Sequence, residues 1–373
     1  MNTYLQWNKK QYSFLMSLVL ILILFFPIVS LAEESELNFQ VQPKFPDSQI
    51  EGSTSYFDLN LEPGTTDNLG LIIRNTAEKE ITIKVTAHTA FTNVNGVVEY
   101  GKEAEEKDPT IKYAMEELIK TPKAIVLAAG EERAIDLPIT MPEESIEGLL
   151  AGGIRIEEVL EETENEENGQ GLAIKNQFSF ILGVLVSNNR STVVPELELL
   201  DVFADQLNYR NVFSATIQNF TPTFVNQLEV EAVIRAKGET DILYKSLTDG
   251  MQMAPNSHFN YPIPLNGDAF RNGNYVASLT ARSGEHEWKW EKEFTINQET
   301  ARRLNREDVT VDTSTNWWMI VAASLILLLG ILIIFLFYQK KKREREHRER
   351  QARIARRRAQ RRKGSEVNES KKN

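Results

Sequence analysis

The chain has 373 residues, enough for about two domains of ~100 to 200 residues each. It contains no cysteine, which excludes disulfides, thiolate zinc sites, iron–sulfur clusters and cysteine nucleophiles. The net charge of −11 is unevenly distributed, because residues 340–373 carry +11, residues 1–32 carry +2 and residues 33–339 carry −24. A negative field of this size argues against nucleic acid as a partner of the central region.

The first 32 residues have the pattern of a secretory signal peptide. Two lysines precede an apolar run over residues 14–28, and small residues lead to Ala32. This order predicts a signal peptide over residues 1–32 that is cleaved after Ala32. An uncleaved anchor helix is the alternative, because the apolar run is at the upper end of the usual length. Both interpretations place residue 33 outside the membrane.

A second apolar run covers residues 317–337 and contains no charge. At ~1.5 Å per residue a helix of this length reaches about 32 Å, enough to cross the hydrocarbon core of a bilayer. We therefore predict a transmembrane helix over residues 317–338, with the lipid bilayer as its partner. The basic segment that follows predicts a cytoplasmic tail over residues 339–373 and an extracellular region over 33–316. An exported, cysteine-free, singly anchored chain favours the cell membrane of a Gram-positive bacterium.

The predicted extracellular region contains short runs of alternating polar and apolar residues, such as 81–86 and 228–234. This period predicts antiparallel sheets with one face in a core, hence an all-β fold of two tandem immunoglobulin-like β-sandwich domains. Pro195 ends one strand pattern and starts another, which predicts domains over 33–194 and 195–298. Residues 299–316 are expected to form a polar, partly helical stalk. One helix is expected over residues 109–120.

The two predicted domains share a local pattern. Residues 69–73 lead to Asn75, a polar gap and the strand at 81–86, and residues 213–217 lead to Asn219, a gap and the strand at 228–234. The pattern indicates two related sandwiches in tandem.

Residues 157–171 hold seven glutamates, which predicts a mobile, self-repelling loop. Calcium binding is the alternative for this loop, although its spacing does not match a known calcium-binding loop.

Catalytic signals are weak. The extracellular histidines His88, His258 and His286 are far apart in sequence, and motifs of zinc hydrolases and serine hydrolases are missing. We therefore predict no catalytic residue, no metal ligand and no cofactor. A pair of carboxylates for glycoside cleavage could come from many strands, so a cell-wall glycan hydrolase is one alternative function. A transmembrane signalling protein, suggested by the long basic tail, is another. Trp288 and Trp290 either fill a core or stack on carbohydrate.

A series of short motifs resembles the WxL-interacting proteins of Gram-positive bacteria. In the first predicted domain these are FQVQP at 39–43, YFDL at 56–59, TNVNGVVEY at 92–100, MP at 141–142 and GLLAGGI at 148–154. In the second they are PEL at 195–197, MAPNSHF at 253–259, GNY at 273–275, WKW at 288–290 and FTI at 294–296.

The resemblance implies a non-enzymatic surface adaptor. Its first domain would bind peptidoglycan, its second a host extracellular matrix protein, and the whole would associate with WxL-domain surface proteins. The chain has no Trp-x-Leu sequence of its own, so it would be the receptor of such a protein and not its ligand.

Ten residues of these motifs are candidate glycan or partner contacts. Asn95-Gly96 predicts a hairpin turn, and Pro255-Asn256-Ser257 predicts a second turn. Two adjacent glycines within a strand indicate either a bulge or a place where another backbone comes close, which would allow a partner to pack there. The candidates are Thr92, Asn93, Asn95, Gly96, Tyr100, Gly152, Gly153, Pro255, Asn256 and Ser257, with the first-domain polar residues expected to form a rim for glycan.

Overall fold

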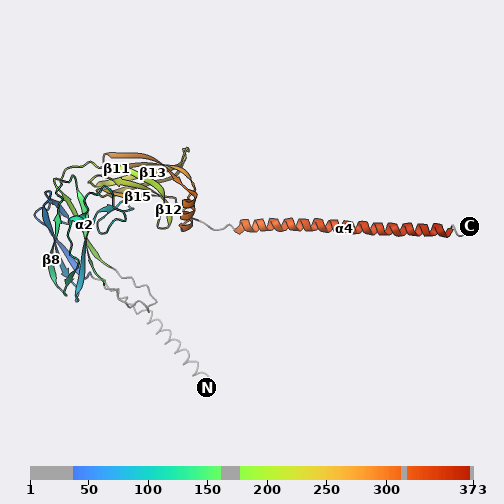
Figure 1. Cartoon of the computed structure of the whole chain (residues 1–373), viewed down its shortest axis with the longest axis horizontal. Coiled ribbons are helices and arrows are strands. Elements are labelled where there is room, and N and C mark those ends of the chain that lie inside the picture. The colour runs from blue at the N-terminus through green and yellow to red at the C-terminus, as the bar shows by residue number, and fades with distance from the viewer. Residues whose placement is uncertain (1–36, 161–176, 312–316, 370–373) are drawn as a thin grey trace, which may run out of the picture. The chain divides into compact units, whose positions relative to one another are not determined.

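The computed structural model describes residues 37–160, 177–311 and 317–369. The chain divides into two compact units, residues 1–309 and 310–373, and each is described by itself (Figure 1). The predicted signal peptide and residues 161–171 of the predicted acidic loop lie outside the described residues. Glu157 and Glu158, at the start of that loop, instead end a strand.

The first sandwich consists of a three-stranded sheet, in the order β1-β3-β8, and a five-stranded sheet, in the order β2-β10-β9-β4-β7. Neighbouring strands are antiparallel, except that β2 runs parallel to β10. A separate hairpin is formed by β5 and β6. The strands are β1 (Phe39–Lys44), β2 (Phe57–Asn60), β3 (Thr66–Asn75), β4 (Ile81–Thr89), β5 (Phe91–Thr92), β6 (Val98–Glu99), β7 (Ile125–Leu127), β8 (Glu132–Thr140), β9 (Leu150–Glu158) and β10 (Ser179–Ser187).

The second sandwich consists of a three-stranded sheet, in the order β11-β12-β15, and a four-stranded sheet, in the order β14-β13-β16-β17. Its strands are β11 (Leu197–Leu207), β12 (Arg210–Asn219), β13 (Val225–Ala236), β14 (Ile242–Met253), β15 (Ser257–Pro264), β16 (Gly273–Ser283) and β17 (His286–Ile296). The prediction of an all-β fold with two tandem immunoglobulin-like sandwiches is confirmed.

The two sandwiches have the same connectivity. The order β1-β3-β8 corresponds to β11-β12-β15, and β7-β4-β9-β10 corresponds to β14-β13-β16-β17, so β2 is an addition at one edge of the first sandwich. Each sandwich has its own core, because alternate side chains of both its sheets face inward. Phe39, Phe57 and Leu71 are buried in the first core, and Phe213 and Tyr261 in the second.

The asparagine shared by the two sequence patterns has the same role in both sandwiches. The side-chain amides of Asn75 and Asn219 each donate to the carbonyl four residues later, at 2.7 Å. Each also donates to a carbonyl at the end of the corresponding later strand, Leu127 at 3.1 Å and Ala254 at 2.8 Å. Both side chains are fully buried. Their amides therefore satisfy backbone carbonyls at a strand end that water cannot reach.

The helices differ from the sequence expectation in extent. The helix expected over 109–120 is limited to the single turn α2 (Met115–Leu118). The Asp108 side chain accepts a hydrogen bond from the Thr110 backbone at 2.9 Å and holds a turn before it. After it, Ile119 is extended and bridges to Ile139.

Residues 299–307 of the expected stalk lie in α3 (Gln298–Glu307), the short orange helix of Figure 1. The Asn297 side chain caps this helix by accepting from the Thr300 backbone at 2.8 Å. Ala301 and Leu304 are buried in the core of the second sandwich, so this part of the segment is packed on the sandwich.

The second unit contains α4 (Trp317–Glu369), drawn as one long helix in Figure 1. Among the described residues it is the one helix that is long and apolar enough to cross a membrane, with a mean hydropathy of 3.2 in its apolar part. The predicted span over 317–338 forms its first part, and basic residues follow in the same helix. It fits a single-pass membrane anchor.

Candidate functional site between the two sandwiches

A hairpin of the first sandwich contacts the second sandwich. It consists of β5, the Asn95-Gly96 turn and β6, and it lies beside β14 and β15. The backbone amide of Gln252 donates to the Gly96 carbonyl at 2.8 Å. Gly96 has a φ of +67°, and a Cβ atom there would lie 2.5 Å from Cγ of Met251. The predicted turn is confirmed, and its glycine is required both by the backbone and by the neighbouring sandwich.

Thr92 and Ser257 form the buried centre of this contact. Their side-chain oxygens are 2.7 Å apart, and the residues are 3% and 2% exposed. The Ser257 hydroxyl donates to the Ala254 carbonyl at 2.8 Å, and the Ala254 amide donates to the Thr92 hydroxyl at 3.0 Å. Thr92 must then donate to Ser257, so the three groups close a ring in which every donor has an acceptor. These two candidate residues join the sandwiches.

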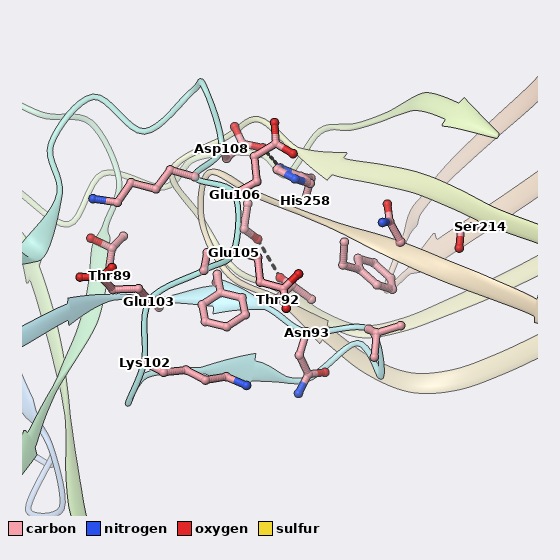
Figure 2. A pocket seen from close by; sticks show the side chains of 18 of the residues that line it. Thr89, Thr92, Asn93, Lys102, Glu103, Glu105, Glu106, Asp108, Ser214 and His258 are labelled. Atoms are coloured by element: carbon pink, nitrogen blue, oxygen red, sulfur yellow. Dashed lines mark hydrogen bonds and ion pairs between the residues drawn. The ribbon is translucent and has the colours of Figure 1, made fainter. Parts of the chain in front are cut away.

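Asp108 forms a second buried polar contact with the second sandwich. Its carboxylate lies 2.8 Å from Nδ1 of His258 (Figure 2). It also accepts two hydrogen bonds from the Gln218 amide, at 3.0 and 2.9 Å. The Thr110 hydroxyl donates to it at 2.5 Å. Asp108 is only 5% exposed, so these donors replace the water that the carboxylate loses.

The hydrogen bonds decide the charge state of this pair. Burial would raise the pKa of Asp108, but the bonds from His258, Thr110 and Gln218 outweigh it and lower the pKa to about 2. The hydrogen bond to Asp108 in turn raises the pKa of His258, against the effect of burial. The geometry therefore favours an ionised carboxylate beside a protonated imidazole.

Between these two contacts lies a cavity of about 560 Å³, lined by both sandwiches. Residues 102–108 of the first sandwich pass along one side and carry Glu103, Glu105 and Glu106, as Figure 2 shows. Ser214, on β12, lies on the other side and donates to Asp205 at 2.8 Å. The one imidazole in the lining is already bonded to Asp108. The cavity thus offers a polar, mainly acidic surface.

An apolar cluster and a second backbone contact complete the interface. Ala90, Val98 and Ala151 of the first sandwich pack with Ala254 of the second. The Leu149 amide donates to the Pro222 carbonyl at 2.8 Å. The interface therefore combines apolar burial with satisfied buried hydrogen bonds. Because these bonds form in one arrangement only, they fix the relative position of the two surfaces in contact.

The structure distributes the ten candidate residues over different positions. The hairpin and the turn at 255–257 meet at the interface, and Asn93, Asn256 and Ser257 line the cavity with Thr92. Asn95 is exposed at the tip of the hairpin. Pro255 is buried within its turn, which is confirmed by its backbone conformation, with Asn256 at φ +49°.

The adjacent glycines of β9 allow a close approach and form no bulge, because the register with β4 and β10 runs without a shift. A Cβ atom on Gly153 would lie 2.5 Å from the Tyr100 carbonyl oxygen, and one on Gly152 would overlap the His88 carbonyl. The close neighbours are therefore segments of this same chain. Trp288 and Trp290, partly buried, pack against the second core.

Sequence reasoning missed Asp108 and Gln218, and treated His258 only as a loop contact. Asp108-Pro109-Thr110 is a turn signal, because a short acidic side chain often binds the backbone two residues later. That signal predicts the local bond to Thr110. It contains no information on His258, which is 150 residues away in the sequence.

Comparison with known families decides what kind of chain this is. The model described as WxL Interacting Protein, peptidoglycan binding domain, matches residues 39–158. The model described as WxL Interacting Protein, host binding domain, matches residues 169–306. Together they match more than half of the chain, in the predicted order. The chain belongs to the WxL-interacting protein family. The resemblance inferred from the motifs is confirmed, and these domains imply binding to peptidoglycan and to a host component.

Solved structures similar to this WxL-interacting chain include fimbrial chaperones and a PapD-like domain. The class 5 fimbriae chaperone CfaA is 11% identical, with a TM-score of 0.27 and coverage of 68% of this chain and 99% of its own. The E. coli chaperone DraB is 12% identical, with a TM-score of 0.26 and coverage of 69% and 98%. PapD-like domain 7 of human CEP192 is 12% identical, with a TM-score of 0.23 and coverage of 42% and 87%. No curated protein matches.

The family matches and the sheets divide this WxL-interacting chain differently. The host-binding match begins at residue 169 and so includes β10. In the structure β10 pairs with β9 and β2 and belongs to the first sandwich. The five-stranded sheet is thus completed by residues outside the peptidoglycan-binding match. The predicted boundary at Val194-Pro195 stays a prediction.

Proposed function

We propose that the chain is a membrane-anchored extracellular adaptor that binds peptidoglycan and WxL-domain surface proteins, with a host extracellular matrix protein as a further ligand. The observation that carries this proposal is that two binding domains of one family follow one another and share a buried polar interface. A fixed interface would let a load on one ligand pass to the other through a single rigid connection. The domains are proposed to be 33–194 and 195–298.

The proposed membrane anchor is α4. Its apolar part is proposed to span the membrane of a Gram-positive cell, with the preceding sandwiches outside and the basic tail in the cytoplasm. Lysines and arginines directly after the span favour this orientation, because translocating them is costly. The adaptor would then be held at the membrane while its sandwiches reach wall components.

The candidate contacts divide by exposure. Thr92 and Ser257 are buried in the interface. Asn95 is exposed, and three further candidates are partly exposed: Asn93, Tyr100 and Asn256. We propose the latter four as residues available to glycan or to a partner. Recognition would depend on hydrogen bonds and aromatic contacts, since the negative charge of this region gives no attraction for anionic polymers.

The adaptor proposal is tested with the full chain in lipid nanodiscs. Purified WxL-domain protein and peptidoglycan sacculi are offered separately and together, and the bound fraction is measured as a function of concentration. Saturable binding of each, and recovery of the WxL-domain protein with sacculi only when the chain is present, are expected. Failure of the WxL-domain protein to bind at high micromolar concentration would contradict the adaptor role.

The same preparation distinguishes an adaptor from a glycan hydrolase. Sacculi incubated with the full chain are expected to release no muropeptides above the level of sacculi alone. Release that a single Asp or Glu substitution abolishes would instead assign the chain to the hydrolases.

A further inference from the structure

A second cavity, of about 490 Å³, lies on the outer face of the five-stranded sheet, where it meets the start of β13 and the end of β14. Its floor is formed by Gly183 on β10, which is directly paired with Gly153 on β9. Gly183 has no side chain and lines the cavity, whereas the backbone of Tyr100 covers Gly153. A ligand can therefore approach the sheet backbone at Gly183. We call this cavity the tyrosine slot.

Two tyrosines lie next to these glycines. A Cβ atom on Gly183 would lie 3.3 Å from Cβ of Tyr56, and one on Gly153 would lie 2.8 Å from Cβ of Tyr100. Both tyrosines line the slot, and Tyr56 is 37% exposed. Neither hydroxyl makes a hydrogen bond with another described residue. Each ring thus offers an apolar face and a free polar group.

The second sandwich supplies one wall of the slot. Phe224 adds a third aromatic ring, and Asn226 and Gln252 add two amides. The Gln252 side-chain NH₂ donates to the Asn226 oxygen at 2.5 Å. This bond orients both amides and leaves the Asn226 NH₂ and the Gln252 oxygen without another bond among the described residues. The slot therefore presents one donor and one acceptor at fixed positions beside the rings.

No residue that lines the slot in the described structure is charged, although residues 33–339 carry −24. A neutral lining favours a neutral ligand, because a charged group would lose its hydration without gaining an ionic partner. Aromatic faces and paired amides suit sugars, whose rings have apolar C–H faces and whose acetamido groups both donate and accept. A charged peptide would find none of the ion pairs that it needs.

We propose that the tyrosine slot binds the N-acetylated sugar strand of peptidoglycan and not its charged stem peptide. The proposal rests on the proposed peptidoglycan binding and assigns it to a site that both sandwiches form. One sugar face lies on Tyr56, the acetamido group reaches the Asn226–Gln252 pair, and the glycine floor admits the strand. Sugar binding would then also stabilise the contact between the two sandwiches.

The probe is chitotetraose, an uncharged β-1,4-linked tetramer of N-acetylglucosamine, titrated by calorimetry into the full chain in nanodiscs. Tyr56→Ala removes a ring whose backbone is held separately, by bonds from Gln49 and Ser53 to its carbonyl. It is expected to weaken binding about tenfold, the value of one aromatic contact and its buried area. Gly183→Val fills the floor without removing a contact and is expected to weaken binding at least as much.

Tyr209→Ala is the matched control, because Tyr209 is 71% exposed in the β11–β12 turn and lies outside the slot. It is expected to bind chitotetraose like the unaltered chain. Thermal unfolding of each variant identifies one that fails to fold, and Tyr56→Ala, a change to a partly exposed side chain, keeps the test valid if Gly183→Val does not fold.

The outcomes separate the two proposals. If the unaltered chain does not sediment with sacculi, peptidoglycan binding itself is wrong. If sacculi bind the unaltered chain, Tyr56→Ala and Gly183→Val equally, peptidoglycan binding stands and the slot is wrong. Binding of a synthetic stem peptide without binding of chitotetraose also overturns the slot proposal. Loss of both chitotetraose and sacculus binding in the slot variants alone supports it.

Discussion

The two sandwiches share one connectivity but differ most in the length of the connection that follows β4 in the first and β13 in the second. Between β13 and β14 the second sandwich has a short turn, at residues 237–241, whereas the first has a long segment, at residues 90–124, between β4 and β7. That segment carries the hairpin, Asp108 and α2. It also makes the buried polar contacts to the second sandwich through Thr92 and Asp108. A common framework is therefore retained, and the insertion supplies the buried side-chain hydrogen bonds of the interface.

The largest effect is expected where the two sandwiches are alike. Asn75→Ala and Asn219→Ala each remove a buried amide that donates to backbone carbonyls, and each is expected to lower the free energy of unfolding by about 2 to 4 kcal/mol. Urea unfolding, monitored with hydrogen exchange, is expected to show loss of protection mainly in the sandwich that carries the change. Equal loss in both sandwiches from either variant would mean that they unfold as one cooperative unit.

The next effect concerns the hairpin, which the second sandwich lacks. Gly96→Ala is expected to destabilise the interface by about 2 kcal/mol, because the new Cβ overlaps Met251 and the φ of +67° is strained for alanine. Asn95→Ala, one residue earlier and exposed, is the control and is expected to change stability by less than about 0.5 kcal/mol. The change in stability is measured by thermal unfolding. Similar changes for Gly96→Ala and Asn95→Ala would show that the contact of Gly96 with the second sandwich does not contribute to stability.

A smaller effect is expected from Thr92→Val, which preserves shape but breaks the closed ring of hydrogen bonds. The Ala254 amide loses its acceptor, and we expect a cost of about 1 to 2 kcal/mol. Hydrogen exchange of the Ala254 amide is the direct measurement. Unchanged protection of that amide would contradict the assigned bond.

The smallest effect is a pH dependence of the interface. Asp108 has its pKa lowered from 3.8 to about 2, so its contribution is present above pH 3.8 and is lost as the pH falls through about 2. His258 has its pKa raised from 6.5, so its contribution is full below pH 6.5 and is lost as the pH rises through the higher folded value. The interface is therefore expected to be most stable between about pH 4 and 6.5.

His258→Gln tests this pH dependence. It is expected to flatten the loss of stability above pH 6.5 in urea unfolding curves, by about 1 kcal/mol or less. His286→Gln, in the exposed β17 hairpin, is the control and is expected to leave the curve unchanged. A His258→Gln chain with the original pH profile would show that the pair does not control the interface.

Much of the fold was predictable from the sequence because its signals are local. The alternation at 81–86 and 228–234 correctly predicted β4 and β13, and the repeated Asn75 and Asn219 patterns correctly pointed to related sandwiches. The helix over 109–120 was predicted too long, since the pairing of Ile119 with Ile139 competes with helix formation and cannot be read from the segment alone.

The candidate site was predictable only in part. The turns at Asn95-Gly96 and at 255–257 follow from residues with tolerance for positive φ. The packing of the two sandwiches brings these turns together. It also brings Thr92 and Ser257, 165 positions apart in the sequence, within hydrogen-bond distance. The expected glycan rim included Thr92, but packing buries it. The role of Tyr56 was not predicted, because its partner Gly183 lies on a strand far along the chain.

By itself the sequence determined the elements whose causes lie within a few residues: the alternating strands, the glycine turns, the apolar segment long enough to span a membrane, and the charge distribution. Only the tertiary structure decided which surfaces face one another: the Asp108–His258 pair, the Thr92–Ser257 ring and the tyrosine slot. The physical reason is the distance along the chain over which each interaction acts. Backbone preference and hydrophobic period act along the chain, whereas a buried hydrogen bond or a cavity exists only after distant segments have excluded water together.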